Sequence, residues 1–198
     1  MINRLRYLLS GFLIALGAFA YISVGGPLGA LLFSFGICSI VGLNIKLYTG
    51  VAGTDAKFKE KLLVLYYNIC GAAIGAQLLL FSVFNNDMFL ETSQKIVDTK
   101  LVTPFYITFF KAVACGAIVD ISVHLSKVHN KFLPLLIGIP TFILCGFNHS
   151  IADAAYFVFA PIEREQLVPF LIYYPICIIG NYIGCNFRRT CKINLLKT

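Results

Sequence analysis

Apolar segments alternate with short polar stretches along the whole chain. The apolar segments cover about 7–24, 28–47, 62–84, 104–126, 132–160 and 167–187. A helix rises about 1.5 Å per residue and the hydrocarbon core of a bilayer is about 30 Å thick, so about 20 apolar residues can cross it. The pattern predicts an all-α membrane protein with six transmembrane helices. They form a single transmembrane domain over residues 1–198.

Polar residues interrupt two of the six segments. The second segment runs into Leu47-Tyr48-Thr49-Gly50 and, shortly after, Gly53, where two glycines and a threonine interrupt the helix pattern. The fifth contains the polar stretch Asn148-His149-Ser150. Ionisable and polar groups at membrane depth usually face a cavity or a partner. We therefore expect helices 2 and 5 to be broken and to line a pathway.

The two halves of the chain, about 7–84 and 104–187, resemble each other. Each has a broken second helix and then an Asn-x-x-Gly sequence in its third helix, at Asn68–Gly71 and Asn181–Gly184. Three spans per half would make the halves enter the membrane from opposite sides. Inverted repeats with broken helices at matching positions are typical of a transport site between the repeats.

Composition and charge fit this membrane assignment. The chain is 59% hydrophobic, its mean hydropathy is +0.83, and only 13% of its residues are charged, against about 25% in soluble domains. If both termini are cytoplasmic, eleven Lys and Arg residues lie inside and only Lys95, Lys100 and Arg164 lie in outside loops. The inside set includes a basic tail over 188–198. The positive-inside rule thus predicts cytoplasmic termini, and the net charge of +7 needs no nucleic-acid partner.

Two ionisable residues are predicted to meet within the membrane. Counting helix rise from the short connection between the fourth and fifth segments places Lys111 about one turn from the level of His149. A cation beside an imidazole would make a cavity attractive to anions. Alternatively, Lys111 extends toward the membrane surface and His149 makes a hydrogen bond between helices.

A metal site is the competing interpretation of the ionisable residues. Asp120 and His124 are four residues apart, as are His149 and Asp153. Helix rise separates the two pairs by roughly 20 Å, which argues against one shared site. We expect no metal or cofactor, and Asp120 and His124 in a cytoplasmic vestibule or a subunit contact. Ser150 cannot use the adjacent His149 as a base on a helix, and no nucleotide-binding motif is present, so an enzyme is not expected.

Several pieces of the chain resemble the formate/nitrite transporter family. The fifth segment carries GFNHSIAD, similar to that family's Gly-Phe-Glu-His-Ser-x-Ala-Asn signature, and the other pieces match the family in order along the chain. The matching pieces are Leu47–Gly50 (LYTG), Phe110–Gly116 (FKAVACG), Gly146–Asp153 (GFNHSIAD) and Gly180–Gly184 (GNYIG).

This resemblance implies an aquaporin-like protomer, a homopentamer with one pore per protomer, and passage of small monovalent anions with or without a proton. His149 would be the central pore residue, preceded by Asn148. Thr49 would be the hydroxyl facing it, Asn181 the nearby amide and Lys111 the nearby cation. Leu47 and Tyr48 would help to form the cytoplasmic constriction.

The chain departs from the family pattern at three positions: Asn148 replaces Glu, Asp153 replaces Asn, and Gly116 replaces Asn. We hypothesise a channel or secondary transporter for formate, nitrite, hydrosulfide or a similar weak-acid anion in the cytoplasmic membrane of a prokaryote. A protonatable His149 would neutralise the anion as it crosses the apolar constriction. The alternatives are a neutral-solute or water channel and a non-transporting membrane scaffold.

Overall fold

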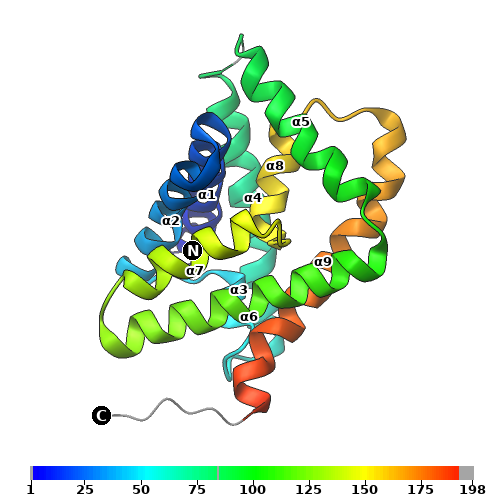
Figure 1. The fold of residues 1–198 in the computed structure, drawn as a ribbon. Helices are drawn as coiled ribbons and strands as arrows, with labels where there is room; N and C mark the ends of the chain where they lie inside the picture. Colours follow the sequence, from blue (N-terminus) through cyan, green and yellow to red (C-terminus); the bar gives the residue numbers. More distant parts are fainter. Residues whose placement is uncertain (1, 84, 192–198) are drawn as a thin grey trace.

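The computed structural model describes residues 2–83 and 85–191, and the regular structure in these ranges is helical (Figure 1). The predicted basic tail begins inside the last helix, and its residues 192–198, including Lys192 and Lys197, lie outside the described residues. The elements are α1 (Ile2–Val24), α2 (Gly26–Gly42), α3 (Tyr48–Val51), α4 (Phe58–Leu80), α5 (Asp87–Val102), α6 (Phe105–His129), α7 (Leu133–Leu144), α8 (Ser150–Phe159), the 3₁₀ helix η1 (Arg164–Gln166) and α9 (Leu167–Thr190).

Four helices in the described part of the chain are long and apolar enough to cross a membrane: α1, α4, α6 and the η1–α9 unit. The remaining apolar helices are shorter. In the second apolar segment, α2 ends at Gly42 and α3 begins at Tyr48. In the fifth, α7 ends at Leu144 and α8 begins at Ser150.

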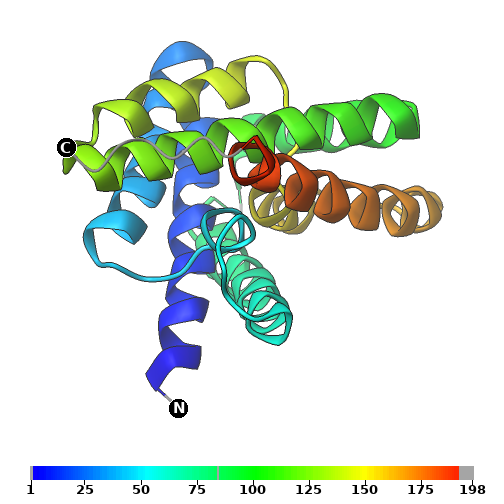
Figure 2. The same ribbon diagram turned by 90° about the horizontal axis from the view of Figure 1, so that it is seen from below.

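Two three-helix groups make up most of the fold. In the first, α1 packs against α2 and α4; in the second, α6 packs against α7 and α9. Figure 2 shows α6 and α9 running beside each other in one group and α1 beside α4 in the other.

Glycines bring the paired helices into close contact. A Cβ atom at Gly71 would lie 2.0 Å from the carbonyl oxygen of Leu8, and one at Gly184 would lie 2.0 Å from that of Val113. Small residues at these positions are what allow membrane helices to approach this closely. The two Asn-x-x-Gly sequences therefore place glycine at equivalent crossings, α1 with α4 and α6 with α9.

Residues 85–100, predicted as a polar loop with or without a short surface helix, are mostly helical. It forms the 16-residue α5, which begins with the Asn86 side chain accepting a hydrogen bond from the Phe89 amide. Phe89 and Val97 are buried, and α5 packs on α1, α8 and α9. The helix is longer and more buried than a short surface helix, because it packs a narrow stripe of apolar residues that the polar sequence conceals.

α8 lies near the centre of the molecule, in contact with α1, α4, α5 and α9 (Figure 1). All but one of its ten residues are buried, whereas α4 and α9 expose large apolar side chains such as Leu78 and Leu171. Contiguous exposed apolar surface of this kind is typical of contact with lipid or another subunit. The buried α8 and the chain break before it hold the candidate site.

Candidate functional site

One buried amide organises the break between α7 and α8. The Oδ1 atom of Asn181, on α9, accepts the backbone N–H of Ser150 at 2.8 Å. Its Nδ2 atom donates to the carbonyl oxygens of Ala112, on α6, and of Asn148, both at 2.8 Å. Asn181 is fully buried, so these bonds replace the water that a broken helix otherwise needs.

Asn68 does the same at the break between α2 and α3. Its Oδ1 atom accepts the backbone N–H of Tyr48 at 2.8 Å. Its Nδ2 atom donates to the carbonyl oxygens of Tyr7, at 2.8 Å, and of Lys46, at 3.3 Å. Asn68 was not among the predicted site residues, although the repeated Asn-x-x-Gly sequence was the signal that marks it.

His149 and Thr49 join the two breaks. The Nε2 atom of His149 lies 3.1 Å from the Thr49 hydroxyl oxygen, and its Nδ1 atom accepts the backbone N–H of Ala152 at 3.2 Å. Because Nδ1 is an acceptor, its partners assign the ring proton to Nε2, which donates to Thr49. The Phe142 ring stacks on the imidazole with centroids 5.6 Å apart.

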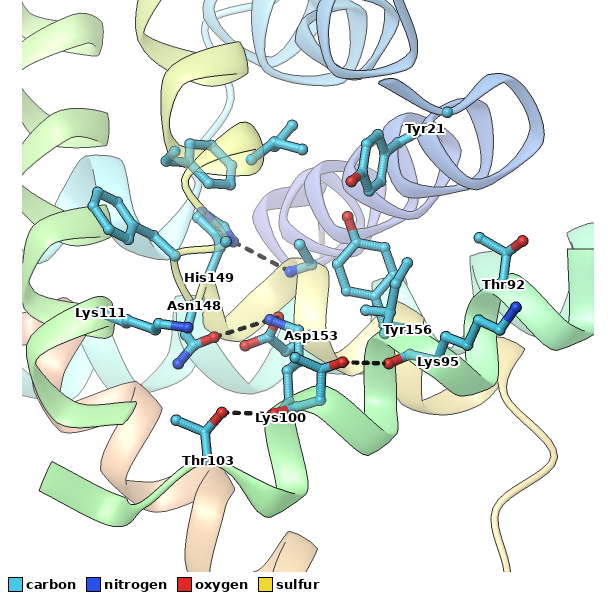
Figure 3. Close-up of a pocket in the computed structure, with 18 of the residues that line it drawn as sticks. Tyr21, Thr92, Lys95, Lys100, Thr103, Lys111, Asn148, His149, Asp153 and Tyr156 are labelled. Atoms are coloured by element: carbon cyan, nitrogen blue, oxygen red, sulfur yellow. Dashed lines mark hydrogen bonds and ion pairs between the residues drawn. The ribbon is translucent and has the colours of Figure 1, made fainter. Parts of the chain in front are cut away.

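A cavity of about 420 Å³ lies on one side of His149, and Lys111, Asn148 and His149 all line it. Figure 3 shows Lys111 beside Asn148 and near His149, so the two predicted neighbours share one cavity. Lys111 makes no hydrogen bond or ion pair with any residue that the structure describes.

The cation bound to the site's acceptors is Lys100, which was expected in an outside loop. Its Nζ atom lies 2.9 Å from Asn148 Oδ1 and 2.9 Å from Asp153 Oδ1 (Figure 3). The other carboxylate oxygen of Asp153 accepts hydrogen bonds from Tyr173, at 2.5 Å, and Cys177, at 3.4 Å. No local sequence signal marks Lys100, because only the packing of α5 on α8 brings it here.

A second cavity, of about 250 Å³, lies on the Thr49 side and is lined by Leu47, Gly50 and the lysines Lys46 and Lys127. Leu47 and Gly50 flank Thr49 closely in the chain, whereas His149 lines the first cavity. Thr49 itself lines neither cavity, so its contact with His149 links the lining of the first cavity to a residue whose chain neighbours line the second. Tyr48 is buried and lines neither cavity; its backbone is held by Asn68.

The geometry can now be set beside known proteins. The sequence model described as "Formate/nitrite transporter" matches residues 5–190. The chain belongs to the formate/nitrite transporter family. This confirms the resemblance seen in the sequence, and it indicates a transport protein rather than an enzyme.

Solved structures show the same fold. A structure described as "Pentameric formate channel with formate bound" superposes with a TM-score of 0.83 at 20% sequence identity, covering 96% of this chain and 94% of that one. An "FNT family ion channel" gives a TM-score of 0.78 at 17% identity, covering 93% and 85%. Curated protein sequences gave no match.

Asp120, in the other acid–histidine pair of this family member, has a partner of its own. The Oδ2 atom of Asp120 accepts a hydrogen bond from Arg188 Nε at 2.9 Å, with His124 one turn away on α6. The two acid–histidine pairs thus bond to different partners. No group of three or more potential metal ligands occurs among residues 2–83 and 85–191.

Proposed function

We propose that this family member is a channel or secondary transporter that passes small monovalent weak-acid anions, such as formate, nitrite or hydrosulfide, across the membrane. The observation that carries the proposal is the His149–Thr49 contact, with His149 lining one lysine-lined cavity and the neighbours of Thr49 lining another. The pair would form a layer between the two cavities. A pathway through this layer would join the two cavities.

The charges around the cavities support anions over cations. Lys95, Lys100 and Lys111 line the first cavity, and Asp153 is the one acidic residue among the described residues of its lining. Lys46 and Lys127 line the second cavity, whose described lining includes no carboxylate. Lys46, Lys95 and Lys100 are paired with carboxylates, so the excess positive charge of the two cavities comes from Lys111 and Lys127. Clefts with one sign of excess charge raise the local concentration of the opposite ion.

The layer itself supplies hydrogen-bond donors in an apolar setting. With His149 Nε2 donating to the Thr49 oxygen, the Thr49 hydroxyl proton is free to point at a passing solute. A bare anion loses much of its hydration here, and protonation lowers that cost. His149 can accept a second proton only if Nδ1 leaves the Ala152 amide, so proton exchange at His149 would involve a movement of the α8 N-terminus.

The proposal includes the arrangement in the membrane. We infer six spans in two inverted repeats, with helices 2 and 5 broken, because Asn68 and Asn181 make equivalent bonds at equivalent breaks. Both termini would face the cytoplasm of a prokaryote. A homopentamer with one pore per protomer is supported by the likeness to the pentameric formate channel and by the apolar faces of α4 and α9, which would contact lipid or subunits.

A flux panel in proteoliposomes tests the function. Formate, nitrite and hydrosulfide entry is measured at a near-neutral and a mildly acidic external pH, and we expect faster entry at the lower pH because more of each anion is protonated. Replacing His149 by Ala should reduce flux on the order of tenfold, since one hydrogen bond of about 1.4 kcal/mol corresponds to that factor.

His129 provides a matched control, because it is an exposed histidine at the end of α6 and its replacement by Ala should leave flux unchanged. Equal anion flux in wild-type protein and in His149→Ala would overturn the proposed role of His149. Faster flux of an uncharged solute than of any anion, without pH dependence, would identify a neutral-solute channel instead.

A further inference from the structure

Lys100 contacts Asn148 and Asp153, two residues whose types differ from those usual at the same positions of the family. Its ammonium group lies 2.9 Å from the side-chain oxygens of both Asn148 and Asp153. Its side chain is 11% exposed and that of Asp153 is 1% exposed, so this ion pair is largely withdrawn from solvent. Tyr173 and Cys177 donate to Oδ2 of Asp153, whereas Oδ1 makes no hydrogen bond with the described residues and has the Lys100 ammonium group as its ion-pair partner.

This bonding decides which groups remain available in the cavity. The oxygen of the Asn148 amide is taken by Lys100, while its Nδ2 atom has only a long 3.4 Å contact to the Thr108 carbonyl oxygen. Asn148 therefore presents its Nδ2 group, a hydrogen-bond donor, to the cavity. A carboxylate at this position would instead have presented an acceptor.

The same bonding leaves Lys111 without a counter-charge among the described residues. Lys95 pairs with Glu91, and Lys100 pairs with Asp153. Lys111 lines the cavity beside Asn148 and makes no ion pair within the part of the chain described (Figure 3). An unpaired ammonium next to an amide donor forms a recognisable pocket for a small anion.

We propose that the Lys100–Asp153 pair is a specificity-determining unit: it sequesters the carboxylate of the first cavity and so creates an anion-binding site from the Lys111 ammonium and the Asn148 Nδ2 group. The ligand class is a small monovalent oxyanion or carboxylate, bound before it reaches His149. The inference rests on the proposed function for its place in transport, but the binding site can be tested separately.

An isosteric exchange provides the sharpest variant. Because Lys100 Nζ is 2.9 Å from both side-chain oxygens, it can pair with a carboxylate at either position. The double variant Asn148→Asp with Asp153→Asn keeps the composition, the net charge and the side-chain volumes. It moves the carboxylate beside Lys111, where it competes with an entering anion.

Transport kinetics give the first readout. We expect the exchange to raise the formate concentration for half-maximal flux on the order of tenfold. The reason is that a negative charge beside Lys111 repels the entering anion by about that factor at an intermediate effective dielectric constant. Lys100→Met, which leaves Asp153 unpaired, should also raise it. Lys100→Met combined with Asp153→Asn removes both charges and should return the value to within about twofold of wild type.

Lysine labelling gives a readout that does not need transport. A short pulse of acetic anhydride followed by mass spectrometry should label Lys111 faster than the ion-paired Lys100, and formate or nitrite should protect Lys111. Protection should be lost in the exchange variant. If Lys111 is protected but no anion crosses the membrane, the proposed function fails and the binding site stands.

Three results would overturn the inference: no protection of Lys111 by either anion, equal protection in the exchange variant, or a half-saturating concentration that the exchange leaves unchanged. If the exchange variant does not elute as folded protein, the role of the pair is tested by comparing Lys100→Met with the double variant Lys100→Met, Asp153→Asn, which lacks both charges of the pair. Equal half-saturation in these two proteins would refute the role of the pair.

Discussion

Replacing Asn181 by Ala tests whether the buried amide holds the break before α8. The change removes three hydrogen bonds, to the Ser150 amide and to the carbonyl oxygens of Ala112 and Asn148, each 2.8 Å long. None of these groups can turn to water, because Asn181 and Ser150 are fully buried. We expect lower stability together with local opening at the start of α8.

The magnitude follows from the number of bonds. Hydrogen bonds between membrane helices are worth about 0.6 kcal/mol on average, and those whose loss leaves a buried group unsatisfied cost about 1–3 kcal/mol. Three bonds at roughly 0.6–1.5 kcal/mol each give a loss of about 1.8–4.5 kcal/mol in the free energy of unfolding. Asn181→Asp keeps the acceptor for Ser150 but loses both donations, so its loss should be similar or larger because a charge is buried.

Unfolding in mixed micelles, followed by circular dichroism, measures the free energy. Hydrogen exchange of peptides that span 145–153 measures the local opening. Asn186 is a matched control on the same helix, because its partly buried Nδ2 atom donates to Ala52 and Tyr182 carbonyl oxygens where water can take its place. Its replacement by Ala should cost at most about 1 kcal/mol. Equal stability and equal exchange in Asn181→Ala and Asn186→Ala would refute the reasoning.

Two further predictions concern packing and charge. Gly184→Ala should sharply lower the yield of folded protein on size exclusion, because the new Cβ would lie 2.0 Å from a backbone carbonyl oxygen of α6; Gly50→Ala, whose Cβ meets a methyl at 3.8 Å, is the control. Arg188→Gln should lower the free energy of unfolding by about 2–4 kcal/mol, because it leaves Asp120 buried without its partner. The same change at the exposed neighbour Arg189 should cost less than about 1 kcal/mol, and an equal loss in both variants would contradict the buried pair.

Short sequence motifs were enough to recognise the family and to predict several site residues. The residues that interrupt the apolar segments could be read directly, and Thr49 and His149 are among them. The structure then brings them together: Thr49 lies 3.1 Å from His149 across 100 residues of chain. Their functional roles stay predictions, since proximity does not measure transport.

Helix α5 shows where local pattern failed. Polar residues are mixed among its apolar ones, so residues 85–100 look like a polar loop, with or without a short surface helix, and Lys100 looks like an outside charge. The buried stripe that contains Phe89 and Val97 has meaning only against α8 and the aromatic side chains around it. Tertiary packing overrode the polar composition of this segment.

Sequence alone determined the helical class and the polar residues that interrupt the apolar segments, because these depend on hydropathy and spacing within single segments. Only the tertiary structure decided which lysine holds Asp153 and which remains unpaired. Lys100 and Asn148 are 48 residues apart, and their contact depends on how α5 is rotated and placed against α8. A helix count by depth gave Lys111 its level in the membrane, but a contact also needs the direction of each side chain and its competing partners.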